Sequence, residues 1–102
     1  GITDYGHRGV PNVFLQAPLL STGTWNGAHF NNKEYDGLVS GYVAALDLEA
    51  QRSAAGKIQR LLLDETPIIF GYFYNFLTAT RTGVSGVVPT AMSHLFLQQA
   101  SL

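Results

Sequence analysis

The chain from residue 31 to residue 46 shows the apolar spacing of an amphipathic helix. Its apolar side chains recur at i, i+3, i+4 and i+7, which places them on one face. Asn31 is the expected cap, with Glu34 three residues later completing a capping box. The predicted buried face consists of Tyr35, Leu38, Val39, Tyr42, Val43 and Leu46.

A second helix is predicted immediately afterwards, from a cap at Asp47 to about Asp64. Charged and small polar side chains line the face opposite its apolar stripe. Pro67 restricts the conformation of Thr66, so the helix must end before it. The predicted stripe consists of Ala54, Ala55, Ile58, Leu61 and Leu62.

Residues 67–81, PIIFGYFYNFLTATR, predict one long strand. Both sets of alternating positions are apolar, which is typical of a strand that is buried on both faces. Together with Tyr42 of the first long helix, Tyr72 and Tyr74 are therefore expected in the core rather than in a site.

The remaining segments predict short elements. Residues 1–5 resemble the end of a strand, and Pro11 suits the first turn of a short helix over residues 12–16. Residues 21–30 are rich in Gly, Thr and Asn and predict a loop. Gly83 and Gly86 mark turns, and residues 94–98 predict a last short strand. The expected fold class is α/β, an α+β fragment with two main helices packed on a small mixed sheet.

The charge content is low for a chain of 102 residues. Only 13% of the residues are charged and 46% are hydrophobic, whereas globular chains average roughly 25% charged residues. A small domain needs polar cover, so the composition indicates that part of the surface is covered by a larger parent chain or by identical copies. No cluster of Lys or Arg favours nucleic acid, and no apolar run approaches the ~18 residues of a membrane span.

The sequence contains no recognisable catalytic or cofactor motif. It has no Walker loop, no nucleotide fingerprint and no Gly-x-Ser-x-Gly. The spacing of His7, His29 and His94 matches no compact zinc site, and the chain has no cysteine. A small hydrolase or isomerase that uses Asp4 and His7 stays open as a third hypothesis, without any accompanying motif. We therefore expect no enzyme activity, no metal and no cofactor.

An ordered series of motifs resembles the C-terminal part of the extracytoplasmic solute-binding proteins of peptide-type ABC importers, the family of dipeptide- and oligopeptide-binding proteins. The resemblance covers nearly all of the chain. No single motif is specific, but the order and spacing of the series are. The motifs are Asp4-Tyr5, Trp25-Asn26, a helix with Asn32, Tyr35, Asp36 and Leu38, a helix from Arg52 to Asp64, an aromatic strand from Pro67 to Tyr74, and a turn from Val84 to Val87.

The resemblance implies a two-lobed protein that closes on its ligand, of which this chain is the C-terminal portion. Residues 1–74 then belong to the second lobe, and residues 75–102 return through the hinge to the first, with the crossing near Tyr74 to Phe76. The implied function is capture of a peptide or peptide-like solute and its delivery to the permease subunits. The implied location is the periplasm, or the outer face of a membrane as an anchored lipoprotein. The implied partners are the ligand, the permease and the rest of the chain. The alternative is a self-standing small α/β domain that oligomerises and has no transport role.

The resemblance also implies the ligand-binding residues. Asp4 matches the Asp that pairs with the ligand's α-amino group, and a buried ammonium requires such an opposite charge. Tyr5, the next residue, is expected to bind the ligand as well. His7 and Arg8 lie in an insertion that departs from the family pattern, and they either face the ligand or are surface residues of a loop. Trp25 either stacks on the ligand or pins its loop to the core, and pinning is favoured. Without the resemblance, Asp4 is equally well explained as a turn or helix cap.

Overall fold

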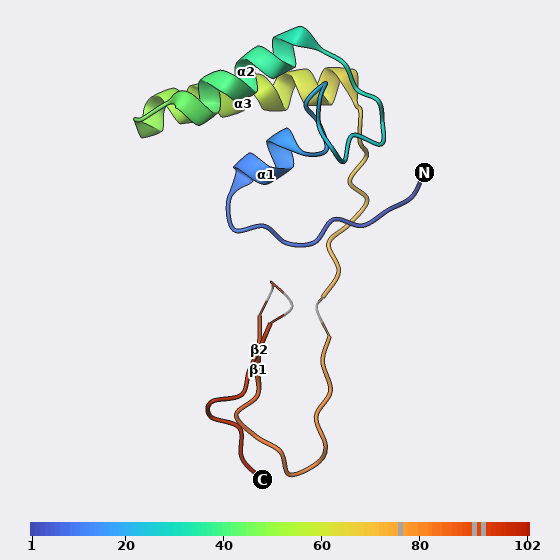
Figure 1. Cartoon of the computed structure of the whole chain (residues 1–102), viewed down its shortest axis with the longest axis vertical. Coiled ribbons are helices and arrows are strands. Elements are labelled where there is room, and N and C mark those ends of the chain that lie inside the picture. The colour runs from blue at the N-terminus through green and yellow to red at the C-terminus, as the bar shows by residue number, and fades with distance from the viewer. Residues whose placement is uncertain (76, 91, 93) are drawn as a thin grey trace. The chain divides into compact units, whose positions relative to one another are not determined.

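The chain is described by a computed structural model that covers residues 1–75, 77–90, 92 and 94–102. It divides into two units, each described by itself. The first unit is Gly1 with Gly9–Phe70, and the second is Ile2–Arg8 with Gly71–Leu102. Among the described residues, the helices belong to the first unit and the strands to the second (Figure 1). Helices accompanied by a small sheet confirm the predicted fold class.

The short helix α1 spans Pro11–Gln16. Proline is suited to its first position, because the missing N–H would have no helical partner there. Val10 precedes it in an extended conformation without a side-chain cap, and the Ala17 N–H donates to the Val13 carbonyl at 3.0 Å. The predicted helix over residues 12–16 is thus confirmed.

Helix α2 spans Lys33–Ala44, and its cap is Asn32 rather than Asn31. The Asn32 Oδ1 accepts a hydrogen bond from the Tyr35 N–H at 3.0 Å. Glu34 is then the second residue of the helix, where it cannot complete the predicted capping box. The Asn31 Oδ1 instead accepts a hydrogen bond from the Ser21 hydroxyl at 3.3 Å. A contact with the preceding loop therefore uses the side chain that was expected to cap the helix.

Helix α3 spans Leu48–Glu65 and begins at the predicted cap. The Asp47 Oδ1 accepts a hydrogen bond from the Ala50 N–H at 2.8 Å. The helix ends at Thr66, which has a left-handed conformation with φ 46°, and whose hydroxyl donates to the Leu63 carbonyl at 2.9 Å. This end is close to the predicted one, as Pro67 requires.

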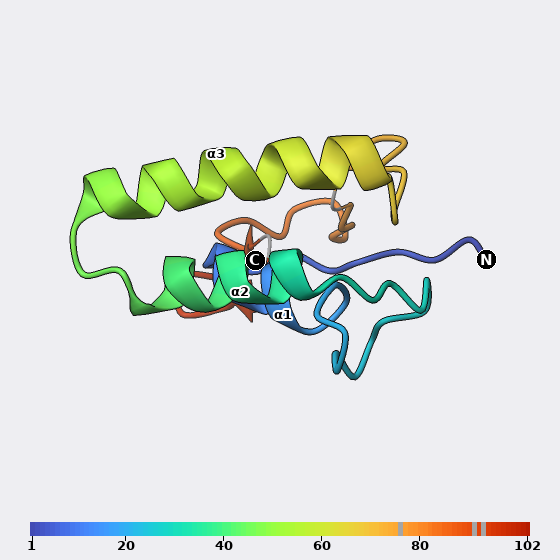
Figure 2. The same cartoon turned by 90° about the horizontal axis from the view of Figure 1, so that it is seen from above.

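Helices α2 and α3 run side by side in opposite directions and form a hairpin (Figures 1 and 2). The buried core joins α2 to α3 and to the chain after α1. Leu15, Leu20, Phe30, Leu38, Tyr42, Leu61, Leu62 and Ile68 pack around it. The core residues themselves are Leu19, Tyr35, Val39 and Ile58.

The predicted buried face of α2 is correct for Tyr35, Leu38, Val39 and Tyr42, which form or surround the core, but not for Val43 and Leu46. Val43 is 44% exposed and Leu46 is fully exposed. The core is centred on Tyr35 and Val39, Val43 lies beyond it, and Leu46 follows the end of the helix at Ala44. The periodicity shows which way a side chain points, but it does not show how far the neighbouring chain extends.

Tyr35 is the side chain that ties α2 to α1. It is completely buried, and its hydroxyl donates to the Leu15 carbonyl at 2.7 Å. Its ring meets the Phe30 ring edge to face, with centroids 5.5 Å apart. Burial, reinforced by the nearby Asp36 carboxylate, raises the pKa of Tyr35 above its ordinary value of 10.0.

This raised pKa predicts a loss of stability in alkali. Unfolded Tyr35 ionises near pH 10, whereas the folded chain retains the proton to higher pH. The contribution to stability is therefore present below pH 10 and declines as the pH rises above it. We expect Tyr35→Phe to lower the free energy of unfolding by about 1 kcal/mol at about pH 8, because one hydrogen bond is lost. At about pH 11 the wild type is itself less stable, so the difference between the two proteins should be smaller.

Urea unfolding at both pH values measures the difference in the free energy of unfolding between the wild type and Tyr35→Phe. Tyr72→Phe is the matched control, because the Tyr72 side chain is 83% exposed. A constant difference between wild type and Tyr35→Phe at the two pH values would contradict the expectation.

The second unit contains an antiparallel pair of short strands, β1 Val88–Pro89 and β2 Leu95–Phe96. Val88 is paired with Phe96 and Pro89 with Leu95. The pairing continues beyond the strands as a bridge between Ser85 and Ser101, with backbone hydrogen bonds of 2.9 and 3.0 Å.

Strand β2 confirms the short strand predicted over residues 94–98, whereas β1 was not predicted. The glycines expected at turns, Gly83 and Gly86, both have positive φ, 94° and 72°. The sheet is antiparallel rather than mixed, and the packing of the two helices on a sheet stays a prediction.

The aromatic segment after α3 is not a strand in the part of the chain that the structure describes. Residues 67–75 and 77–81 contain no strand pairing, and Tyr72, Phe73 and Tyr74 are 83%, 99% and 61% exposed. The prediction that this segment is a buried strand, with Tyr72 and Tyr74 in the core, is therefore wrong for this chain. A strand requires a partner for its backbone groups, and the alternation of side chains does not supply one.

The prediction of a strand end at residues 1–5 is also wrong, since these residues form no strand. Phe76, at the expected crossing between lobes, lies outside the described residues.

Candidate functional site

The N-terminal segment and the aromatic segment meet in the second unit. The Tyr74 hydroxyl donates a hydrogen bond to Asp4 Oδ2 at 3.2 Å. The two residues are 70 positions apart in the sequence. Both side chains are exposed, so the pair presents a carboxylate at the surface of this unit.

The electrostatics of this pair favour a protonated tyrosine beside a charged carboxylate. The hydrogen bond to Asp4 and the negative charge of its carboxylate raise the pKa of Tyr74 above its ordinary value of 10.0. Tyr74 is therefore a neutral donor at physiological pH, and it leaves the charge of Asp4 in place.

The other predicted residues of this segment, Tyr5, His7 and Arg8, lie in a stretch without helix or strand. The Arg8 Nη1 donates to the His7 carbonyl at 2.9 Å. A Cβ added at Gly6 would lie 3.1 Å from the same nitrogen, so Arg8 folds back over its own loop. Tyr5 and Arg8 are half-buried, and His7 is exposed. Their roles as ligand-binding residues stay predictions.

Trp25 belongs to the first unit, in the loop between α1 and α2, and is therefore described apart from Asp4. Its backbone N–H donates to the Ala17 carbonyl at 2.9 Å, and its side chain is 48% exposed. The next residue, Asn26, closes the loop. Its amide nitrogen donates to the Leu20 and Phe30 carbonyls at 3.0 and 2.7 Å, and its oxygen accepts from the Phe30 N–H at 2.9 Å. Asn26 therefore has a structural role, and the ligand contact of Trp25 stays a prediction.

A charged groove lies between the start of α2 and the end of α3 in the first unit. Its volume is about 340 Å³. Lys57 and Arg60 face it together with three acidic side chains, so charges of both signs compensate each other. The lining residues are Asn32, Glu34, Lys57, Arg60, Leu61, Asp64 and Glu65.

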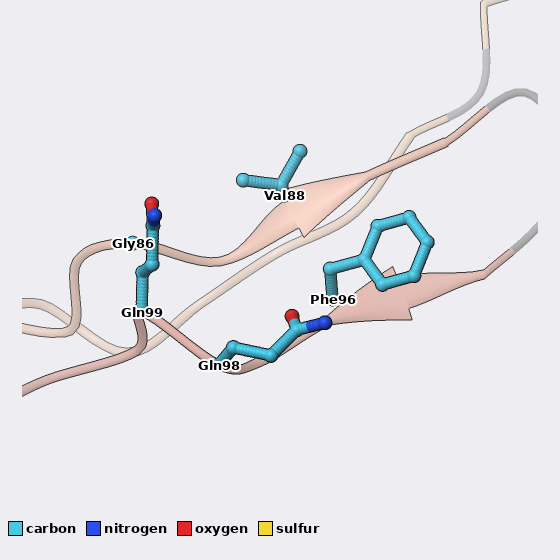
Figure 3. Close-up of a pocket in the computed structure, with 5 residues that line it drawn as sticks. All are labelled: Gly86, Val88, Phe96, Gln98 and Gln99. Atoms are coloured by element: carbon cyan, nitrogen blue, oxygen red, sulfur yellow. The ribbon is translucent and has the colours of Figure 1, made fainter.

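A shallow hollow of about 370 Å³ lies beside the strands of the second unit (Figure 3). Val88 and Phe96 supply apolar surface, and Gln98 and Gln99 supply amides. Gly86 is required at its edge because φ is positive and because a Cβ there would overlap the Gln99 carbonyl. Among the described residues, none that lines this hollow carries a charge.

Two further properties concern only the residues that the structure describes. No three His, Asp or Glu side chains in these residues lie close enough to hold a metal ion. No helix in the described ranges has the length and apolar character needed to cross a membrane.

The chain is similar to the dipeptide-binding protein DppE of Bacillus subtilis (strain 168). The two are 33% identical over 91 residues, which is 88% of this chain and 16% of that protein. The chain thus spans about a sixth of the length of this relative. No family model matches the chain, and no solved structure matches it.

The similarity supports the resemblance to peptide-binding proteins at a coarse level. The relative is named for binding a dipeptide, not for catalysis. Sequence reasoning identified Asp4 as the candidate carboxylate but did not identify Tyr74, which it assigned to the core. No signal of spacing links two residues 70 positions apart, so only the fold of the second unit reveals this pair.

Proposed function

We propose that this chain is part of a solute-binding protein that captures a peptide or peptide-like solute by its α-amino group and delivers it to an ABC importer. The similarity to a dipeptide-binding protein over 88% of the chain carries this proposal. The carboxylate that the resemblance assigns to the amine supports it, since Asp4 is exposed and held by a neutral donor.

The chemistry of Asp4 suits recognition of an ammonium group. A carboxylate and an ammonium form a charge-assisted hydrogen bond, about twice as strong as a neutral one. The amine loses water when the ligand is enclosed, and an opposite charge compensates this loss. In the proposed protein, Asp4 belongs to the second lobe, and closure of the first lobe over it provides the enclosure.

The proposal extends to the partners and the location of the protein. A receptor of this kind operates outside the cytoplasm, in the periplasm or anchored to a membrane, and docks on permease subunits. It performs no chemistry and requires no cofactor. The exposed apolar side chains of the first unit, such as Leu46 and Leu63, are in this proposal covered by other parts of the protein.

Isothermal titration calorimetry of the intact protein tests the proposal. Alanyl-alanine and its N-acetylated form are titrated in parallel, because acetylation converts the positively charged amine into a neutral amide that carries an added acetyl group. We expect the free dipeptide to bind and the acetylated form to bind at least roughly tenfold more weakly, which corresponds to about 1.4 kcal/mol. An intact protein that binds neither dipeptides nor longer peptides in the same assay would contradict the proposal. An assembly of identical copies without ligand binding, detected by light scattering, would favour the oligomeric domain instead.

A further inference from the structure

Within the described part of the chain, the Asp4 carboxylate accepts a side-chain hydrogen bond at Oδ2 alone. Tyr74 donates to Oδ2, and among the described residues no group donates to Oδ1. An exposed Asp side chain samples several rotamers in water, and binding must restrict them at a cost in entropy. A contact that restricts the carboxylate before the ligand arrives reduces this cost.

Tyrosine is well suited to hold a carboxylate for this purpose. Its phenol is neutral at physiological pH, so it does not compete as a cation with the ligand. A Lys or Arg in the same place would form an ion pair with Asp4 and neutralise the charge that attracts an ammonium group. The tyrosine side chain also has few rotatable bonds, which makes it a rigid support.

Taken together, we propose that Tyr74 is a positioning residue that holds Asp4 by Oδ2 and directs Oδ1 toward the α-amino group of the ligand. This inference rests on the proposed function, because it assigns a further residue to the same amine-binding site. Tyr74 acts through Asp4, so its contribution should disappear when Asp4 can no longer pair with an amine.

Tyr74→Phe removes the hydroxyl and retains the ring. Tyr72→Phe is the matched control, since Tyr72 lies two residues away, is exposed, and its hydroxyl forms no hydrogen bond to any described residue. Calorimetry of the intact protein with alanyl-alanine and with its N-acetylated form measures the dissociation constants. We expect Tyr74→Phe to raise the constant for the free dipeptide roughly threefold to tenfold, the value of one hydrogen bond. Tyr72→Phe should leave it unchanged.

A double-mutant cycle separates positioning from general support of the fold. On an Asp4→Asn background, Tyr74→Phe should have no further effect on the affinity, and for the N-acetylated dipeptide it should have little effect even with Asp4 present. Equal weakening of both dipeptides, or an equal effect with and without Asp4, would overturn the positioning role. A Tyr74→Phe protein that binds the free dipeptide as tightly as the wild type would also overturn it, while the proposed function would stand. A wild-type protein that binds no peptide would overturn both.

Discussion

Asp4→Ala is expected to weaken the binding of an amine-bearing peptide by about 2–5 kcal/mol, the usual cost of removing one partner of a desolvated charge pair. The ligand's ammonium would be enclosed without an opposite charge, and part of the cost is this unpaired charge itself. Isothermal titration calorimetry of the intact protein with alanyl-alanine measures the loss directly. Asp4→Asn should lose most of the same affinity, because the amide keeps the shape but not the charge.

Asp64→Ala is the matched control for this experiment. Asp64 is an exposed carboxylate near the end of α3, where an acidic side chain is unfavourable to the helix dipole. Its removal subtracts one negative charge without destabilising the fold. An affinity equal to that of the wild type for Asp4→Ala, or equal losses for Asp4→Ala and Asp64→Ala, would remove Asp4 from the binding site.

The second large effect is expected on stability. Ile58 is only 1% exposed and is the buried residue through which α3 joins the core of the helical hairpin. Ile58→Ala leaves a cavity that the neighbouring helix fills only in part. We expect a loss of about 2–5 kcal/mol in the free energy of unfolding. Urea unfolding followed by circular dichroism measures this loss.

Leu63→Ala serves as the control on the same helix. The Leu63 side chain is 77% exposed, so its truncation should change the free energy of unfolding by about 0.5 kcal/mol or less. If Leu63→Ala proved as damaging as Ile58→Ala, Leu63 would have to be buried in the intact protein. That result would show that another segment covers Leu63. An unchanged free energy of unfolding for Ile58→Ala would contradict the burial of Ile58 in the core.

The helices were the most predictable part of the fold, because their signals are local. Asp47 caps α3 as expected, and Ile58 is buried at its predicted position. The one-residue error at the start of α2 has a tertiary cause. Of two adjacent asparagines, Asn31 is engaged by the Ser21 hydroxyl, and only Asn32 remains to cap the helix.

The aromatic segment and the contact of Asp4 with Tyr74 were less predictable, because both depend on contacts between distant residues. Alternating apolar side chains indicated a strand, but no pairing is formed by the described residues of 67–81. Tyr74 of this segment donates a hydrogen bond to Asp4. This contact was not predicted, because Tyr74 was assigned to the core. Identifying Asp4 itself required the resemblance to a family, since a single carboxylate has no local signature of ligand binding.

The sequence by itself determined that two long helices are present, that the second begins after Asp47, and which faces of the helices are apolar. These properties follow from residues within one or two turns of each other. The tertiary structure alone decided how far the core extends along α2, which asparagine is the cap, and that Tyr74 donates to Asp4. Each of these depends on contacts between residues that are 10 to 70 positions apart. The path of the intervening chain decides which groups meet, and the periodicity of the sequence carries no information about it.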